Sequence, residues 1–226
     1  MNLPLSREVA VEPAHTALLF IDVQNFNCHW QGGEYAQLAE AQKQARYGYF
    51  FRTLRETALP NMVRLREACR RAGIEVLYTV IESLTADGRD RSLDYKITGF
   101  NVPKGSPDAQ PLAELAPGPD EILIPKTSSS VFISTNIDYV LRNLGTRYLI
   151  VAGCLTDQCV DSAIRDACDL GYLVSVPTDA CVALSAEQHD SSLRNNRGYC
   201  RQRSTRELLE EIISLCTSPP ISNPRT

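Results

Sequence analysis

Residues 147–160, RYLIVAGCLTDQCV, join a nearly continuous apolar run to the beginning of an amphipathic stretch. A short, uninterrupted apolar run of this kind is typical of a strand that is covered on both faces. The apolar positions that follow are spaced as on one face of a helix: Val160, Ala163, Ile164, Ala167 and Cys168. Gly171 is placed to end that helix. The segment therefore predicts a strand, a tight turn and a helix, with Cys159 in the first helical turn.

Four similar apolar runs are spread along the chain, at residues 16–24, 74–81, 121–126 and 172–177. Amphipathic stretches separate them, and we expect helices after Pro60, over 137–144 and over about 204–215. This alternation with short connections predicts an α/β fold with a mainly parallel central sheet and helices on both faces. The 226 residues contain no internal repeat and fit one domain, 1–226. The Pro-rich polar tail, residues 217–226, is expected to be mobile.

Two long segments interrupt this order. Residues 25–57 carry seven of the 16 aromatic residues, and residues 82–110 are rich in Gly, Pro, Asp and Ser. Long segments in a compact α/β domain are usually lids or partner contacts, and we expect that here.

Composition excludes several classes of partner. The net charge is −4 and the Lys and Arg residues are scattered, which argues against nucleic acid. Nothing in the sequence resembles a signal peptide, and no apolar run approaches the ~20 residues that span a bilayer, so we expect a cytoplasmic protein without membrane contact. Eight cysteines occur without a Cys-x-x-Cys pair or zinc spacing, and most are expected to be free and inert.

Chemically active side chains lie where three of the predicted strands end. Asp22 ends the first strand, Lys126 ends the third, and Cys159 follows the fourth. Because ligands of open α/β sheets bind beyond the carboxyl ends of the strands, these residues are placed to meet at one edge. Taken singly, each has an ordinary structural explanation: a turn or cap for Asp22, a solvated side chain for Lys126 and packing for Cys159. Together they are chemically complementary.

A thiol attacks a carbonyl group as a thiolate, which a helix N-terminus and a nearby ammonium favour. Asp22 can accept the thiol proton and return it to the leaving nitrogen, while Lys126 orients the carboxylate. The backbone N–H groups of Leu155 and Cys159 could hold the oxyanion. The three histidines lie away from the strand ends, which disfavours a Cys–His pair.

Three segments together resemble the signatures of the isochorismatase-like cysteine hydrolases: IDVQN at 21–25, PK at 125–126 and GCLTDQCV at 153–160. That superfamily includes nicotinamidases, N-carbamoylsarcosine amidases, biuret hydrolases and ureidoacrylate amidohydrolases, and the resemblance covers roughly residues 14–215. It implies that Asp22, Lys126 and Cys159 are the catalytic triad and that the Cys154–Leu155 peptide bond is cis. It also implies a homo-oligomer, a dimer or tetramer.

Two departures narrow what the resemblance implies. Nicotinamidases hold a metal through Asp and His residues after the second strand, whereas residues 79–92, TVIESLTADGRDRS, contain no histidine. We therefore expect no metal and no cofactor, and nicotinamide is disfavoured as substrate. Superfamily members that cleave a vinyl ether lack the cysteine, which this chain has. The two long segments are most similar to the ureidoacrylate and carbamoyl-amide group.

The sequence thus predicts a cysteine-dependent amidohydrolase that cleaves a C–N bond of a small amide, carbamoyl or ureido compound through a thioester. The alternative is a non-catalytic module of the same fold that serves in binding or assembly. A nucleotide-binding protein is disfavoured because neither glycine-rich phosphate motif occurs. Six residues are candidates to contact the substrate: Gln24, Asn25, Phe26, Trp30, Glu82 and Tyr95. For each aromatic residue, packing at a subunit contact explains its presence equally well.

Overall fold

Seven strands form one parallel sheet in the computed structural model, which describes residues 6–217. The strands are β1 Thr16–Ile21, β2 Glu75–Ile81, β3 Ile122–Lys126, β4 Tyr148–Cys154, β5 Leu173–Pro177, β6 Cys181–Val182 and β7 Arg201–Arg203. Their order across the sheet is β3-β2-β1-β4-β5-β7, and the short β6 pairs with the end of β4. All the pairs are parallel. The predicted α/β class and all five predicted strands are confirmed.

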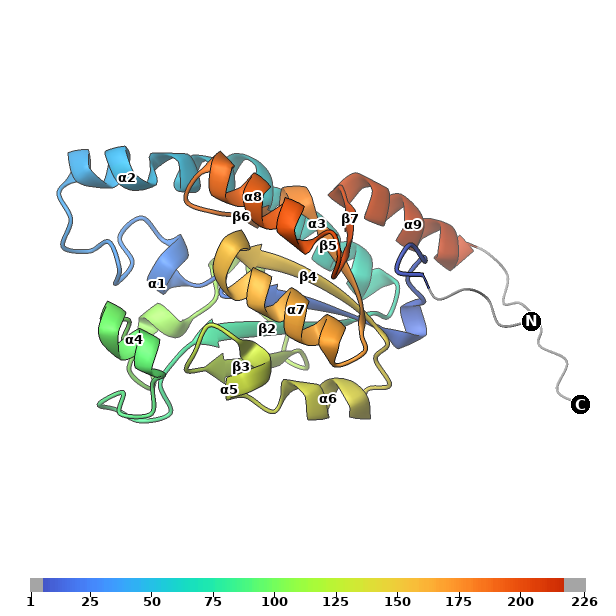
Figure 1. Ribbon diagram of the computed structural model, residues 1–226, viewed down its shortest axis with the longest axis horizontal. Coiled ribbons are helices and arrows are strands. Elements are labelled where there is room, and N and C mark those ends of the chain that lie inside the picture. The colour runs from blue at the N-terminus through green and yellow to red at the C-terminus, as the bar shows by residue number, and fades with distance from the viewer. Residues whose placement is uncertain (1–5, 218–226) are drawn as a thin grey trace, which may run out of the picture.

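Helices cover both faces of this sheet (Figure 1). They are α1 Asn25–Cys28, α2 Glu40–Thr53, α3 Leu59–Arg71, α4 Leu93–Thr98, α5 Val131–Ser134, α6 Ile137–Asn143, α7 Asp161–Asp169, α8 Ala186–Asn196 and α9 Thr205–Thr217. Successive side chains of a strand point to opposite faces. Leu18 and Phe20 of β1 pack in one core cluster with residues of α2, α3 and α9. Leu19 and Ile21 pack in the other, with residues of α5, α6 and α7.

The central strands end within two residues of one another along the sheet. Ile21, the last residue of β1, is level with Thr79 of β2 and with Gly153 of β4. Asp22 follows with a φ of 53°, a left-handed conformation that ends the strand. The predicted strand over 16–24 is therefore shorter than expected.

Residues 40–71 are helical throughout, and this corrects two expectations. A π-helical turn at Leu54–Ala58 connects α2 directly to α3, so the helix does not begin at Pro60. Pro60 instead occupies the first turn of α3, behind this wider turn, where proline is tolerated. Phe50, Phe51 and Leu54 are buried in the main core cluster. This part of the segment 25–57 is therefore core structure and not a lid.

Three further elements have no apolar pattern that could predict them. The helix α8, AEQHDSSLRNN, and the strand β7, RQR, are both polar, and β6 is only two residues long. None of the helices in residues 6–217 is long and apolar enough to cross a bilayer. Most of the tail that we expect to be mobile, 217–226, lies outside the described residues.

Candidate active site

The carboxyl edge of the sheet brings Asp22, Lys126 and Cys159 together. Asp22 follows β1, Lys126 is the last residue of β3, and Cys159 lies in a π-helical turn, Thr156–Val160, between β4 and α7. Lys126 Nζ lies 2.8 Å from Asp22 Oδ2 and 3.4 Å from Cys159 Sγ. The ammonium is thus in contact with both of the other groups.

Asp22 is fully buried and is fixed mainly by the neighbouring strand β2. Its Oδ1 accepts a hydrogen bond of 2.8 Å from the Thr79 hydroxyl, and its main-chain N–H donates to Thr79 O at 3.2 Å. Oδ2 makes the ion pair with Lys126 but receives no aligned hydrogen bond from the described residues. A lone pair on Oδ2 therefore stays available to accept a proton.

Lys126 is also fully buried, and its ammonium is surrounded by acceptors. Besides Asp22 and Cys159, it donates to the main-chain oxygen of Ser128 at 2.8 Å and to the Tyr95 hydroxyl at 3.1 Å. Burial has the largest single effect and lowers the pKa of this ammonium, but Asp22, Cys159 and Tyr95 together outweigh burial and hold the pKa above its ordinary value. Lys126 is therefore a fixed positive charge.

The pKa of the Cys159 thiol is raised above its ordinary value. Burial raises it most, Lys126 lowers it and the Asp22 charge raises it, and together these effects place the pKa at about 11. The sequence predicted a thiol pKa below the ordinary value because of the helix start and the ammonium, and this prediction is wrong. Only 6% of the residue is exposed, and this desolvation exceeds both favourable effects. The thiol must therefore lose its proton as it attacks, and Asp22 Oδ2 is placed to receive it.

The peptide bond between Cys154 and Leu155 is cis, as the resemblance implied. It lies at the end of β4, immediately before the π-helical turn that carries Cys159. Leu155 therefore stands at the same turn as the thiol, where its N–H and that of Cys159 are candidates to hold an oxyanion.

A cavity of about 460 Å³ opens beside Cys159. Its walls come from α4, the segment after it, the loop after β3, and the turn that leads into α7. The lining residues are Asp94, Tyr95, Thr98, Phe100, Ser129, Asp157, Gln158, Cys159, Asp161 and Ser162. A cavity of this size accommodates a small organic molecule.

Of the six predicted substrate contacts, Tyr95 alone lines this cavity. Phe26 packs behind it, with its ring 5.5 Å from that of Phe100. Trp30 lines a different and larger cavity of about 700 Å³, which none of the three catalytic candidates lines. Phe26 and Trp30, expected to contact the substrate, thus do not line the cavity beside Cys159.

The polar candidates bind main chain instead of facing the cavity. Gln24 is fully buried, and its amide bonds Ile81 N and O and Asp108 O. Asn25 donates to Pro107 O at 3.0 Å, and Glu82 accepts from Gly105 N at 2.7 Å. Gln24 and Asn25 hold residues 107–108 against the end of β1, and Glu82 holds Gly105 near the end of β2. The sequence next to Asp22 does not distinguish such a structural role from substrate binding.

Sequence reasoning missed most of the cavity wall. Asp157 and Gln158 were visible inside the quoted motif GCLTDQCV, and Asp161 and Ser162 follow it directly. Thr79 lies two residues before the end of β2. Because side chains alternate between the two faces of a strand, the Thr79 side chain points to the same face as that of Ile81. Asp94, Thr98, Phe100 and Ser129 depend on how the long loops fold, and no local pattern marks them.

The described residues hold no group of three or more His, Cys, Asp or Glu side chains that could bind a metal ion.

The model of the isochorismatase domain matches residues 16–207 of this sequence. The chain belongs to the isochorismatase family. A relative, the ureidoacrylate amidohydrolase RutB of Agrobacterium fabrum, is 32% identical to this chain over 197 residues. The alignment covers 80% of this chain and 82% of the relative.

Two solved structures share the family fold with this chain. A cysteine hydrolase from Pseudomonas syringae pv. phaseolicola matches with a TM-score of 0.76 at 24% identity, covering 95% of this chain and 100% of the other. The N-carbamoylsarcosine amidase of Thermoplasma acidophilum matches with a TM-score of 0.63 at 24% identity, covering 84% and 96%. At these identities the likeness concerns the fold.

Proposed function

We propose that this isochorismatase-family chain is a cysteine-dependent amidohydrolase that cleaves a C–N bond of a small amide, carbamoyl or ureido compound. The observation that carries the proposal is the position of Lys126 Nζ, which touches both Asp22 Oδ2 and Cys159 Sγ beside a cavity. The relative named ureidoacrylate amidohydrolase supports the same reaction class.

In the first half of the reaction, Cys159 Sγ attacks the carbonyl carbon as its proton moves to Asp22 Oδ2. The negative charge that develops on the carbonyl oxygen is held by the N–H groups of Leu155 and Cys159. Lys126 compensates the charge on the sulfur as it forms. When the intermediate collapses, the C–N bond breaks and Asp22 returns its proton to the nitrogen. Ammonia or an amine then departs, and the acyl group stays on Cys159 as a thioester.

In the second half, water attacks the thioester carbonyl, and Asp22 takes a proton from it. Collapse of this second intermediate breaks the C–S bond, and the thiol is re-formed with the proton held by Asp22. Every proton transfer in these steps has a donor and an acceptor among Asp22, Cys159, the leaving nitrogen and water.

The test is a panel of carboxamides, carbamoyl and ureido compounds, with ammonia release and intact-protein mass as readouts. We expect turnover of at least one compound and an acyl adduct on Cys159, both of which are lost in Cys159→Ala. Cys168→Ala is the matched control, because Cys168 lies further along α7 and outside the cavity lining. Tight binding without turnover or adduct would favour the alternative, a binding or assembly module.

We propose further that the chain forms homo-oligomers and acts in the cytosol. Large apolar side chains that are mostly exposed support association: Leu93 at 73%, Ile97 at 75% and Ile133 at 79% exposure. Light scattering should give a dimer or tetramer, and a monomer at all concentrations would contradict it. Fractionation of cells that express the chain should recover activity with the cytosolic fraction.

A further inference from the structure

The cavity beside Cys159 has an acidic wall. Three of its lining residues are aspartates, Asp94, Asp157 and Asp161, and none is Lys, Arg or His among the residues that the structure describes. The remaining lining groups are hydroxyls, one amide, two aromatic rings and the thiol. A ligand that enters this cavity therefore meets more acceptors than donors.

The three aspartates are not equivalent. Asp161 is compensated, because Arg165 Nε donates to its two oxygens at 3.2 Å and 3.1 Å and Asn196 donates to it as well. Asp157 has a buried Oδ1 with no hydrogen-bond partner among residues 6–217. Asp94 lies exposed on α4, at the cavity wall. Asp157 and Asp94 thus keep negative charges that the protein does not neutralise.

Nearby cations do not offset these charges. Lys126 is held by Asp22, Ser128 O and the Tyr95 hydroxyl, behind the cavity wall. Arg91 donates to the main-chain oxygens of Gly88, at 2.8 Å, and Phe100, at 2.6 Å. An anionic group in the cavity would find no cationic side chain among the described residues that line it.

His189 also lies within the field of Asp157 but adds no positive charge at neutral pH. Burial lowers the pKa of its imidazole, and the raising effects of Asp190 and Asp157 are smaller. Its Nδ1 is paired with the Thr156 hydroxyl at 2.8 Å.

We infer that this site selects amides whose remote end is neutral or cationic and carries N–H donors, and that Asp157 and Asp94 set this preference against carboxylates. The inference rests on the proposed function and deepens it. It separates this chain from the ureidoacrylate amidohydrolase of Agrobacterium fabrum, because ureidoacrylate carries a carboxylate. Carboxylates in the cavity lining favour a hydrogen-bond donor from the ligand and disfavour a second anion.

The expected discrimination follows from Coulomb's law. Two like charges ~6 Å apart at an effective dielectric of ~20 repel strongly enough to change binding about 100-fold. Solvent screening of the exposed Asp94 reduces this value, and we expect a preference of about 30-fold.

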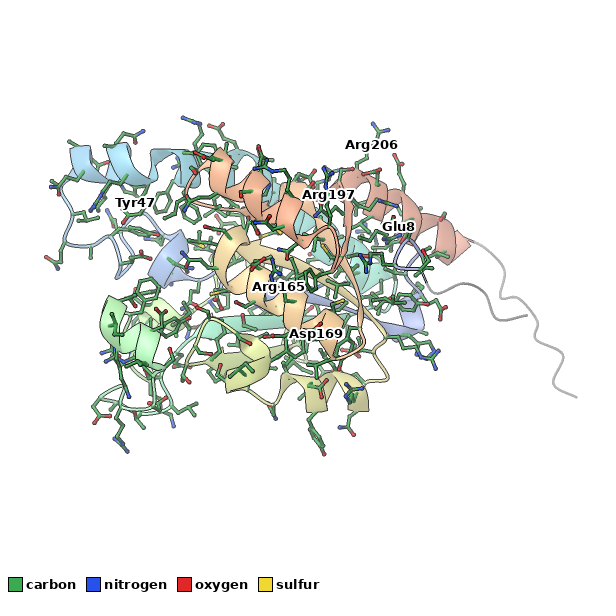
Figure 2. All side chains as sticks on the ribbon, viewed as in Figure 1. Glu8, Tyr47, Arg165, Asp169, Arg197 and Arg206 are labelled. Carbon is green, nitrogen blue, oxygen red and sulfur yellow. The ribbon has the colours of Figure 1, made fainter. Side chains whose placement is uncertain are left out.

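The experiment compares two compounds that differ only at the remote end, 3-ureidoacrylamide and 3-ureidoacrylate. We expect kcat/KM about 30-fold higher for the amide, and a ratio reduced to about 5-fold or less in the double variant Asp94→Asn/Asp157→Asn. The control is Asp169→Asn, which removes the same charge at the far end of α7 from Cys159 (Figure 2). It should leave the ratio unchanged.

Binding of both compounds to Cys159→Ser, measured by calorimetry, gives the ratio without turnover. An equal or greater affinity for the carboxylate overturns the inference, as does a ratio that the double variant leaves unchanged. Asp94→Asn alone should lower the ratio part of the way, which keeps the test valid if Asp157→Asn does not fold. If the amide binds selectively but does not acylate wild-type Cys159, the proposed function is wrong while the inferred selectivity still holds.

Discussion

Gly153 of β4 lies directly against the main chain of Ile21 in β1. The two residues are level across the strand pair, and a Cβ on Gly153 would lie 2.2 Å from Ile21 O and 2.7 Å from Ile21 N. Gly153 also has a φ of +128°. Since Ile21 precedes Asp22 and Gly153 precedes the cis peptide bond, this contact fixes the spacing of two strand ends that carry the site.

Gly153→Ala should therefore lower the free energy of unfolding by more than ~3 kcal/mol and abolish turnover in whatever protein folds. Gly171→Ala is the matched control: its φ of +94° is also left-handed, but a Cβ there meets nothing within 4 Å. The control should cost about 1 kcal/mol. Urea unfolding measures both, and similar losses in the two variants would show that the contact with Ile21 is unimportant.

Asp22→Asn should have opposite effects on thiol reactivity and on turnover. Because the Asp22 charge raises the pKa of the Cys159 thiol, which stands at about 11, its removal should lower that pKa. Alkylation by iodoacetamide at pH 8 should then be faster than in the wild type, while kcat falls by ~10²–10⁴. Wild-type alkylation should rise about tenfold per pH unit up to the pKa. Slower alkylation in Asp22→Asn would argue against this electrostatic coupling.

Lys126→Met should destabilise the fold, because it leaves the buried Asp22 charge without its partner. Both side chains are completely buried, so the ion pair has no water to replace a lost partner. We expect a loss of ~3–5 kcal/mol for Lys126→Met, of which the double variant Asp22→Asn/Lys126→Met recovers part. Thermal and urea unfolding decide it, and additive losses would indicate that the two charges do not interact.

Thr79→Val should reduce kcat about tenfold with little change in KM. The Thr79 hydroxyl donates to Asp22 Oδ1 at 2.8 Å, and Thr79 does not line the cavity. Loss of the hydroxyl should therefore disturb the position of the Asp22 carboxylate and leave substrate binding unchanged. Thr79→Ser keeps the donor and should restore kcat. A rise in KM alone, or no rescue by serine, would mean that Thr79 acts through packing.

Glu121 should make stability depend on pH in the acid range. Burial raises the pKa of its carboxyl, but hydrogen bonds from Arg70 at 2.7 Å and 2.8 Å, Gly118 N and Tyr78 outweigh burial and lower the pKa to about 2. A lowered folded-state pKa stabilises the protein above the ordinary value of about 4.5, and that stability is lost as the pH falls toward 2.

At pH 7, Glu121→Gln should therefore cost ~2–3 kcal/mol, and the difference from the wild type should shrink between pH 4.5 and pH 2. The control is Glu210→Gln, which breaks the exposed pair with Arg206 and should leave stability unchanged. A difference that persists undiminished at pH 2.5 would assign the loss to packing and not to charge.

The sheet and the three meeting residues could be predicted from sequence because they depend on local patterns. An apolar run marks each of the five main strands, and the parallel arrangement brings Asp22, Lys126 and Cys159 to one edge whatever the loops do. By contrast, β7 is RQR and α8 is mostly polar, so neither has an apolar face to reveal it. The continuous helix through Pro60 depends on a π-helical turn that no residue type announces.

The cavity wall and the state of the thiol could not be predicted for a different reason. Both depend on how α4 and the loop after β3 close over the sheet edge, which brings Tyr95 onto Lys126 and buries Cys159. A sequence shows that a cysteine stands near a lysine and a helix start, but the pKa depends on how much water remains. Here desolvation has the larger effect.

The buried pair of Asp22 and Lys126 also bears on how this chain can diverge. A single substitution at either position leaves an unpaired charge in a fully buried position. A descendant that loses the catalytic reaction through such a substitution therefore also loses folding stability. The two positions should therefore covary, both charged or both uncharged, even in descendants where the thiol is gone. A descendant that kept both charges after losing Cys159 would still carry the ion pair as a structural element of the sheet edge.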